Sequence, residues 1–502
     1  MKILLTTLNA KYVHSAPALR YLYNSAGGYG KFIHIHEFTI NHNDGHIFTE
    51  ILRNDYDVVC FSCYIWNGER ILYLAENLKK AAPQMKIILG GPEATQRWDD
   101  ILERQEAIDF VVLGEGEKVF PMLLNALLQK QDWTDIPGLA GRVKDGIFYN
   151  QPDEAMDFSQ VPFIYDKIPW EDDRIIYYEA SRGCAFRCGY CLSSIDKTVR
   201  QRPIHMVKKE LDHFLRGKVR QVKLVDRTFN LDPQRCYDLF KYLMDNDNGV
   251  TNFHFELCGE LITAQHIELL KRARQGLFRF EIGVQSTNEE TLKACNRPGN
   301  FDRIKENVKA LRVVGNIVLH LDLIAGLPYE DYNTFRKSFN DVYSLLPDEL
   351  QLGFLKMLPG TALRKEAEKY GYVYRRKAPY EMISNDFLSI EDVIKLKDIE
   401  HVLDLYYNKG GFKSTLEYLT GIKGTTPFDF YSEFADYYYG EGLQHRSHSK
   451  ESLYRIMYGY GLRKSIEYPE LWVLVKELLR EDMAKYLNPE TVKRFDKIGW
   501  ES

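Results

Sequence analysis

The sequence has little cysteine, no long apolar run and no large excess of charge of one sign. Eight cysteines in 502 residues are too few for a disulfide-stabilised scaffold. No segment approaches the roughly 20 consecutive apolar residues that a membrane-spanning helix needs. With 66 Lys and Arg against 71 Asp and Glu, the net charge is −5, so nothing indicates broad attraction to nucleic acid or anionic lipid. Low-complexity tracts and solenoid repeats are also missing, which excludes disordered and fibrous classes.

What remains is the composition of a globular protein of several domains. A chain of 502 residues, 45% apolar and 27% charged, has room for separate cores, because domains hold roughly 100–200 residues each. The N-terminus, MKILLTTLNAKYVHSAP, lacks the long apolar segment and cleavage site of a signal peptide. We therefore expect a cytoplasmic protein without a membrane partner.

The first 143 residues alternate short apolar runs with helical patterns. Strand-like runs cover 2–8, 32–38, 57–64, 86–91 and 109–114, and helical spacing covers 16–25, 68–82 and 118–128. The third to fifth runs are almost continuously apolar, as parallel strands covered on both faces are. The pattern predicts a doubly wound α/β domain, Rossmann-like and of the flavodoxin type, whose ligand lies at the carboxyl ends of the strands.

Three further regions follow. Residues 144–173 contain three prolines and no sustained periodicity, which predicts a linker. Residues 174–370 predict a partial (β/α)6 barrel with its site at the carboxyl ends of the strands; its strand-like runs are 174–181, 221–226, 252–257, 279–284, 318–326 and 349–357. Residues 371–502 carry amphipathic patterns rich in Tyr and Phe, which predict a helical C-terminal domain with an aromatic core.

Three cysteines stand within eight residues, directly after the first predicted barrel strand. Cys184, Cys188 and Cys191 form a C-x3-C-x2-C loop, and Gly183 and Gly189 ease its tight wrapping. A closed structural metal site takes four protein ligands. Three thiolates therefore leave one metal position open, as in an iron–sulfur cluster that binds a chelating amino acid. A three-ligand zinc site and chance spacing are the alternatives.

This loop, with Tyr190 just before its last cysteine, resembles the radical S-adenosylmethionine (SAM) superfamily. Later segments resemble that superfamily's motifs in the same order: 225–230 (VDRTFN), 281–286 (EIGVQS), 322–328 (DLIAGLP) and 358–361 (LPGT). The resemblance implies that Cys184, Cys188 and Cys191 hold a [4Fe–4S] cluster. It also implies a SAM site that consists of Tyr190 near the adenine, Asp226 at the methionine end, Gln285 and Ser286 near the ribose, and Glu256 as a further candidate.

The N-terminal domain resembles that of the cobalamin-binding class of the same superfamily. The matching stretches are 57–62 (DVVCFS), 88–95 (ILGGPEAT) and 113–117 (LGEGE). The resemblance implies that cobalamin is contacted by Ser62, Gly90, Gly91, Pro92, Gly114, Gly116 and Glu117. Taken alone, the glycine-rich turns fit ordinary strand-to-helix connections equally well.

The loop after the first strand departs from many cobalamin domains, which supply an axial histidine from an Asp-x-His-x-x-Gly motif. Here the loop reads Asn9-Ala-Lys-Tyr-Val-His14. We therefore expect cobalamin to bind without a protein histidine on cobalt, with His14 as the alternative ligand.

Other cysteines and histidines have simpler interpretations. Cys60 and Cys63 lie on one predicted strand with side chains on opposite faces, so we expect core thiols. Four histidines lie in or near the Asn-His-Asn-Asp-Gly loop at residues 41–45, at positions 34, 36, 42 and 46. Such a loop favours solvated turn residues over zinc ligands. The cysteines at 236, 258 and 295 lack the spacing of a second cluster, which weakens a methylthiotransferase interpretation.

The resemblance implies a cobalamin-dependent radical SAM enzyme, and a methyltransferase in the first place. In that class one SAM molecule methylates cobalamin, and a second yields the 5′-deoxyadenosyl radical that activates an unreactive carbon; methylcobalamin then methylates this carbon. The same architecture hosts cyclisation and other rearrangements, which are the alternative. A further alternative is a cobalamin-binding regulatory protein whose barrel has no catalytic activity.

Partners and substrate are less defined by the sequence. The class implies an electron donor of flavodoxin or ferredoxin type. A small molecule, a peptide and a tRNA all remain candidate substrates. We expect the C-terminal domain to close over the barrel or contact the substrate, and its basic stretch 444–450 to be a solvated loop rather than a phosphate site.

Overall fold

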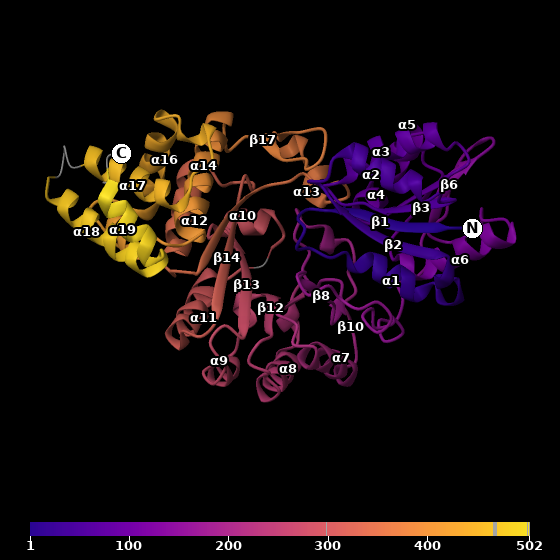
Figure 1. The fold of residues 1–502 in the computed structure, drawn as a ribbon, viewed down its shortest axis with the longest axis horizontal. Coiled ribbons are helices and arrows are strands. Elements are labelled where there is room, and N and C mark those ends of the chain that lie inside the picture. The colour runs from indigo at the N-terminus through magenta and orange to yellow at the C-terminus, as the bar shows by residue number, and fades with distance from the viewer. Residues whose placement is uncertain (298, 465–468, 499, 501–502) are drawn as a thin grey trace. The chain divides into compact units, whose positions relative to one another are not determined.

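A computed structural model of the chain describes residues 1–297, 299–464, 469–498 and 500. The chain forms two compact units. The first consists of Met1–Arg279, Lys356–Glu366 and Tyr374–Glu381, and the second of Phe280–Leu355, Ala367–Val373 and Met382–Ser502. Both contain α/β structure, and the helices after residue 389 belong to the second (Figure 1). The expected α/β class with a helical C-terminal region is confirmed.

The N-terminal part of the first unit is a seven-stranded sheet in the order β2-β1-β3-β4-β5-β6-β7. Its first five strands are parallel, and β6 and β7 are antiparallel. Their bounds are β1 (Ile3–Asn9), β2 (Ile33–Thr39), β3 (Val58–Ser62), β4 (Lys86–Gly90), β5 (Phe110–Val112), β6 (Leu139–Val143) and β7 (Gly146–Tyr149). The order confirms the predicted doubly wound domain and places the switch point, where such folds bind ligands, between β1 and β3.

Helices cover both faces of this sheet (Figure 1). One face packs on α1 (Pro17–Ser25) and α6 (Gly116–Gln129). The other packs on α2 (Asp44–Arg53), α3 (Gly68–Ala81), α4 (Pro92–Gln96) and α5 (Trp98–Arg104). Successive residues alternate between the two cores, as strand geometry requires. Cys60 lies in the core under α1 and α6, and Cys63 in the opposite core, so the prediction of two buried thiols on opposite faces is confirmed.

The sheet continues beyond residue 143. Strands β6 and β7 form a hairpin in which Val143 lies opposite Gly146, so Lys144 and Asp145 make a two-residue turn. The short β7 therefore falls within residues 144–173, for which we predicted a linker. Three of its four residues are exposed, and its sequence, GIFY, has no alternation of apolar and polar residues that would have revealed it. Residues 150–173 contain no helix or strand.

Six strands separated by helices follow, as predicted for the barrel. In the first unit β8, β11 and β12 are parallel neighbours; in the second, β14 and β15 are parallel neighbours. The strand bounds are β8 (Ile176–Tyr178), β11 (Gln221–Leu224), β12 (Asn252–Leu257), β13 (Phe278–Gln285), β14 (Val318–Ala325) and β15 (Glu349–Phe354). The helix bounds are α7 (Ile204–Arg216), α8 (Pro233–Asp245), α9 (Ala264–Leu270), α10 (Glu289–Ala294), α11 (Phe301–Val314) and α12 (Tyr332–Tyr343).

The C-terminal region is helical with an aromatic core, as predicted. Its helices are α14 (Ile390–Leu403), α15 (Lys413–Thr420), α16 (Pro427–Gly440), α17 (Lys450–Lys464), α18 (Pro469–Tyr486) and α19 (Pro489–Ile498). Capping boxes at Ser389 and Thr426 start α14 and α16. Tyr406, Tyr431 and Tyr454 are fully buried, so these aromatic residues form core.

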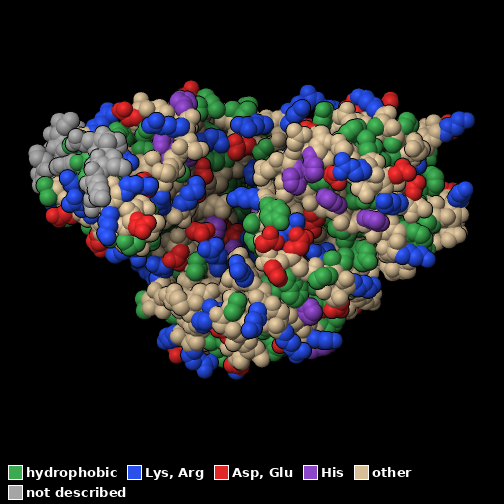
Figure 2. Space-filling view, viewed as in Figure 1, with side chains coloured by type: hydrophobic (Ala, Val, Ile, Leu, Met, Phe, Trp, Pro, Cys, Tyr) green, Lys and Arg blue, Asp and Glu red, His purple; other side chains and the backbone are tan. Residues whose placement is uncertain are grey.

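The surface matches the balanced composition. On the face that Figure 2 shows, Lys and Arg side chains are interspersed with Asp and Glu. Within the described part of the chain, no helix has the length and apolar character to cross a membrane.

Candidate functional site

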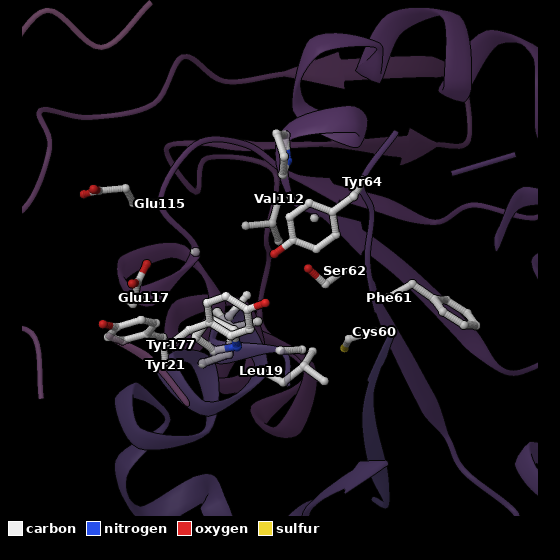
Figure 3. Close-up of a pocket in the computed structure, with 18 of the residues that line it drawn as sticks. Leu19, Tyr21, Cys60, Phe61, Ser62, Tyr64, Val112, Glu115, Glu117 and Tyr177 are labelled. Carbon is white, nitrogen blue, oxygen red and sulfur yellow. The ribbon is translucent and has the colours of Figure 1, made fainter. Parts of the chain in front are cut away.

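A cavity of about 600 Å³ lies at the carboxyl ends of β1, β3, β4 and β5 (Figure 3). Its wall includes Ser62, Gly90, Gly91, Pro92, Gly114, Gly116 and Glu117, the seven residues for which we predicted cobalamin contacts. Figure 3 shows Ser62, Tyr64 and Tyr177 pointing into the cavity, with Glu115 and Glu117 along one side. The folded first unit thus brings together the seven predicted contacts, which are up to 55 positions apart in the sequence.

The glycines of the wall serve two purposes. Gly91 has φ +93°, and a Cβ there would lie 2.6 Å from the Cys63 carbonyl oxygen, so the turn itself requires glycine. At Gly90, by contrast, the nearest atoms to a Cβ belong to Val112, at 3.8 Å, and at Gly114 to Pro152, at 3.9 Å. A Cβ would therefore make only ordinary van der Waals contacts at these two positions, although the φ of +68° at Gly114 favours glycine there as well. This open backbone cradle fits a large flat ligand such as the corrin of cobalamin.

His14 also lines the cavity. Its Nδ1 lies 2.5 Å from the Tyr177 hydroxyl. Burial lowers the pKa of His14, and Lys11 and Lys223 lower it further, so the ring is neutral near pH 7. The Tyr177 hydroxyl can donate to Nδ1 or accept from it, and Nε2 is protonated in the first case and carries the free lone pair in the second. Binding of cobalamin without a histidine ligand stays a prediction.

The cysteine loop begins and ends at a two-stranded neck. Strand β9 (Ser181–Arg182) pairs antiparallel with β10 (Arg200–Gln201) and encloses residues 183–199. Gly183 has φ +87°, and a Cβ there would lie 2.2 Å from the Thr198 carbonyl oxygen, so the loop is tightly wrapped next to the first cysteine. Within the loop the Cys191 backbone N–H donates to the Cys188 carbonyl oxygen at 3.0 Å.

The three loop thiols have the donor chemistry of an iron–sulfur site. Cys188 is buried, and Cys184 and Cys191 are half-buried. Burial raises the pKa of Cys184; bonds from the Phe186 backbone and Thr228 oppose this, while Cys191 and Cys188 raise it further. In the described residues, no group of three or more His, Cys, Asp or Glu is arranged to hold a single metal ion. Three neighbouring thiolates do fit a [4Fe–4S] cluster with one open iron, which Cys184, Cys188 and Cys191 would hold.

Three of the residues predicted for the SAM site lie in the first unit. Tyr190 is within the cysteine loop, and Glu256 lies on β12 with Oε1 3.9 Å from Lys223 Nζ. Asp226 follows β11 and is buried; it accepts hydrogen bonds from the Ala180 backbone N–H at 3.0 Å and the Ser181 hydroxyl at 2.5 Å. Burial raises the pKa of Asp226 to about 7. Asp226 thus ties the end of β11 to the residues that lead into the cysteine loop.

The other two residues lie in the second unit, at the end of β13. Gln285 has φ +72°, and its Nε2 lies close over Gly283. The Ser286 hydroxyl donates to Glu330 Oε1 at 2.6 Å, and the Ser338 hydroxyl donates to the same oxygen at 2.7 Å. Glu330 is fully buried, and this burial raises its pKa to about 7. The SAM roles of all five residues stay predictions.

A charged cluster that was not predicted from the sequence joins the cavity wall to the β9–β10 neck. Arg182 donates to Glu117 at 2.6 Å and to Glu179 at 2.9 Å, and its guanidinium carbon lies 4.9 Å from the centroid of the Tyr21 ring. Arg200 donates to Glu115 Oε1 at 2.8 Å. Burial acts to raise the pKa of Glu115, but Arg200 and Arg182 outweigh it and lower this pKa. The sequence offered a signal: Glu115 stands between the predicted cobalamin contacts Gly114 and Gly116, and Arg182 precedes the first cysteine by two positions.

Two further candidate sites have ordinary surroundings. Histidines gather over the N-terminal sheet, which Figure 1 draws in indigo (Figure 2); His42 and His46 have ring centroids 5.4 Å apart, and His34, His36 and His46 are exposed. In the stretch 444–450, His445 and Arg446 are exposed, and Lys450 donates to the Gly410 carbonyl oxygen. The latter arrangement fits the predicted solvated loop.

Comparison with known proteins finds three family models along the chain. The B12 binding domain matches residues 3–124, the radical SAM superfamily matches 178–342, and a protein family of unknown function, DUF4080, matches 368–498. The first two coincide with the cavity-bearing sheet and with the cysteine loop and the barrel strands up to β14.

Relatives and solved structures agree with these models. A 2-(S-pantetheinyl)-carbapenam-3-carboxylate methyltransferase of Streptantibioticus cattleyicolor is 24% identical over 64% of this chain and 50% of its own length. This chain therefore spans about half of that relative. An anaerobic magnesium-protoporphyrin IX monomethyl ester cyclase of Rubrivivax gelatinosus is also 24% identical, over 73% of this chain and 70% of its own length.

Among solved structures, that of the cobalamin-dependent SAM radical enzyme OxsB, with aqua-cobalamin and SAM bound, superposes with a TM-score of 0.66. It covers 98% of this chain and 81% of OxsB at 13% identity, which is a likeness of fold. Because a B12 binding domain precedes a radical SAM domain along the chain, the chain belongs to the cobalamin-binding class of the radical SAM superfamily.

Proposed function

We propose that the chain is a cobalamin-dependent radical SAM methyltransferase that acts on an unactivated carbon. The observation that carries the proposal is the composition of the cavity wall. The seven predicted cobalamin contacts share this wall with Tyr177, Glu179 and Arg227, which come from the ends of barrel strands β8 and β11. A ligand in the cavity therefore meets the end of the barrel from which the cysteine loop starts.

The residues of the chain have separate tasks on this account. Bound cobalamin carries methyl groups, and SAM at a [4Fe–4S] cluster supplies a 5′-deoxyadenosyl radical. Cys184, Cys188 and Cys191 hold the cluster. Tyr190, Asp226, Glu256, Gln285 and Ser286 bind SAM, and the seven residues of the cavity wall bind cobalamin. The methyltransferase activity of the carbapenam relative supports this assignment.

Cyclisation is the second candidate. The match to the magnesium-protoporphyrin cyclase covers 73% of this chain and 70% of that enzyme, more of both than the match to the carbapenam methyltransferase. In either case an external electron donor is needed, and we propose one of flavodoxin or ferredoxin type.

A substrate-independent experiment separates the two candidates. Anaerobically purified protein with its cluster and cobalamin is incubated with a strong reductant and SAM labelled in its methyl group. A methyltransferase transfers the label to cobalamin and releases S-adenosylhomocysteine. Formation of 5′-deoxyadenosine without either product would favour the cyclisation class. Absence of all three products would leave a cobalamin-binding regulatory protein.

A further inference from the structure

The neck of the cysteine loop places two arginines directly opposite one another. In the β9–β10 pair, Arg182 is the register partner of Arg200. Directly opposite residues of antiparallel strands have Cβ atoms about 4.5–5.5 Å apart, and like charges there destabilise the pair. The side chains are only 12% and 13% exposed, so water screens their repulsion weakly. The closed neck therefore needs a counter-charge.

Glu115 supplies this counter-charge to both arginines. Its Oε1 lies 3.3 Å from Arg182 Nη1 and 2.8 Å from Arg200 Nη2, and its Oε2 lies 3.0 Å from Arg200 Nη1. The Met156 backbone N–H donates to Oε2 at 3.2 Å and fixes the carboxylate. The neighbouring acids pair with one arginine each: Glu117 and Glu179 with Arg182, and Asp196 with Arg200. Within the described ion pairs, Glu115 is the carboxylate that bridges the two arginines.

Glu115 belongs to the cobalamin domain rather than to the loop that it closes. It lies between Gly114 and Gly116 in the turn after β5 and lines the cavity (Figure 3). Arg182 also lines this cavity. The same turn thus holds predicted cobalamin contacts and the counter-charge of the cysteine loop, whose first thiol follows Arg182 by two residues.

We propose that Glu115 is a positioning residue for the cluster. By holding Arg182 and Arg200 together, Glu115 keeps the neck closed, and the closed neck fixes the loop in which Cys184 and its two companions present their thiolates. The inference rests on the assignment of these cysteines to a cluster, which is part of the proposed function. Glu115 acts through the two arginines and is not a ligand.

A double-mutant cycle tests the charge argument. Glu115→Gln preserves shape but leaves two opposed arginines without their shared counter-charge. Arg200→Gln removes the opposition and loses only the contacts of Arg200, including that with Asp196. The double variant also has no opposed pair. We expect iron to leave the anaerobic protein for a chelator roughly tenfold faster in Glu115→Gln, and the double variant to return to the rate of Arg200→Gln, since contacting residues couple non-additively.

A spectroscopic readout and controls complete the test. The electron paramagnetic resonance signal of the reduced cluster should become heterogeneous in Glu115→Gln and uniform again in the double variant, a rescue that a general loss of packing would not produce. Glu103→Gln, an exposed glutamate of α5, should match the unmodified protein.

Two results would overturn the inference: an iron-loss rate in Glu115→Gln equal to that of the unmodified protein, or a double variant as impaired as Glu115→Gln or worse. A variant with alanine at all three cysteines separates this from failure of the proposed function. If that variant keeps its iron, the cluster assignment itself is wrong. If it loses its iron while Glu115→Gln retains it normally, only the inference about Glu115 fails.

Discussion

The cavity predicted to bind cobalamin and the predicted SAM site differ in how their residues are distributed. All seven predicted cobalamin contacts line one cavity within the first unit. Of the predicted SAM residues, Tyr190, Asp226 and Glu256 belong to the first unit, and Gln285 and Ser286 to the second. Two of them, Asp226 and Ser286, have polar groups engaged in buried internal hydrogen bonds.

The two sites depend on different parts of their residues. The cavity consists mostly of backbone turns at the ends of parallel strands, and a doubly wound sheet brings those ends together. The SAM residues act through side chains, whose hydrogen-bond partners depend on the local packing. The position of a backbone turn can therefore be predicted from a sequence motif more directly than the position of a side-chain atom. The following substitutions test this contrast, beginning with the cavity.

Replacing Gly91 should break the cavity. In Gly91→Ala the new Cβ would lie 2.6 Å from the Cys63 carbonyl oxygen at a φ of +93°, so the turn between β4 and α4 must shift. We expect cobalamin affinity, measured by absorbance titration, to fall at least about tenfold, which corresponds to roughly 1.4 kcal/mol. Gly28→Ala, where a Cβ has no neighbour within 4 Å, is the control. Unchanged affinity in Gly91→Ala would show that this turn does not shape the site.

The buried carboxyl beneath Ser286 should make stability depend on pH. Burial raises the pKa of Glu330 to about 7, so the folded chain holds this proton where the unfolded chain has released it. The free energy of unfolding therefore falls as pH rises from about 4.5 to about 7. Glu330→Gln removes this titration while its Oε1 still accepts from Ser286 and Ser338.

Relative to the unmodified protein, Glu330→Gln should thus gain up to about 3 kcal/mol on going from acidic to mildly alkaline pH. Thermal or denaturant unfolding across this range measures the gain. Glu290→Gln, an exposed glutamate of α10, should give no such difference. Parallel stability profiles for Glu330→Gln and the unmodified protein would mean that Glu330 is ionised in the folded state.

The smallest effect is expected at His14. His14 lines the cavity, and its Nδ1 contacts the Tyr177 hydroxyl. Because we expect cobalt to have no histidine ligand, His14→Ala should leave the cobalt-dependent absorbance and paramagnetic spectra of bound cobalamin unchanged. Cobalamin affinity should change by no more than a few-fold, as expected for one hydrogen bond of about 1 kcal/mol. A shift to the spectrum of a cobalamin without axial nitrogen would identify His14 as the ligand.

Most of the fold followed from periodicity, and the exceptions have physical causes. The five parallel strands and the aromatic helices appeared because their apolar spacing is strong. Strand β7 was missed because its sequence, GIFY, has no alternation of apolar and polar residues. Helix α2 was missed although Ile47 and Ile51 lie about one turn apart on its buried face. The prediction of core thiols at Cys60 and Cys63 succeeded since alternation on a strand is a local rule.

Part of the candidate site could be predicted from the sequence. The cysteine triplet and the glycine turns are local patterns, and the turns converge as sheet topology requires. The bridge from Glu115 to Arg182 and Arg200 joins residues 67 and 85 positions apart, so no local pattern contains it. The bond from Ser286 to Glu330 was equally hidden, because it depends on a residue 44 positions further along the chain.

The most direct test of the account is the content of iron and cobalamin per chain. Protein produced and purified anaerobically with cobalamin supplied is compared with the variant Cys184→Ala/Cys188→Ala/Cys191→Ala. We expect about four irons and one cobalamin per unmodified chain, and cobalamin without iron in the variant. Iron without cobalamin in the unmodified protein, or iron retained in the variant, would contradict it.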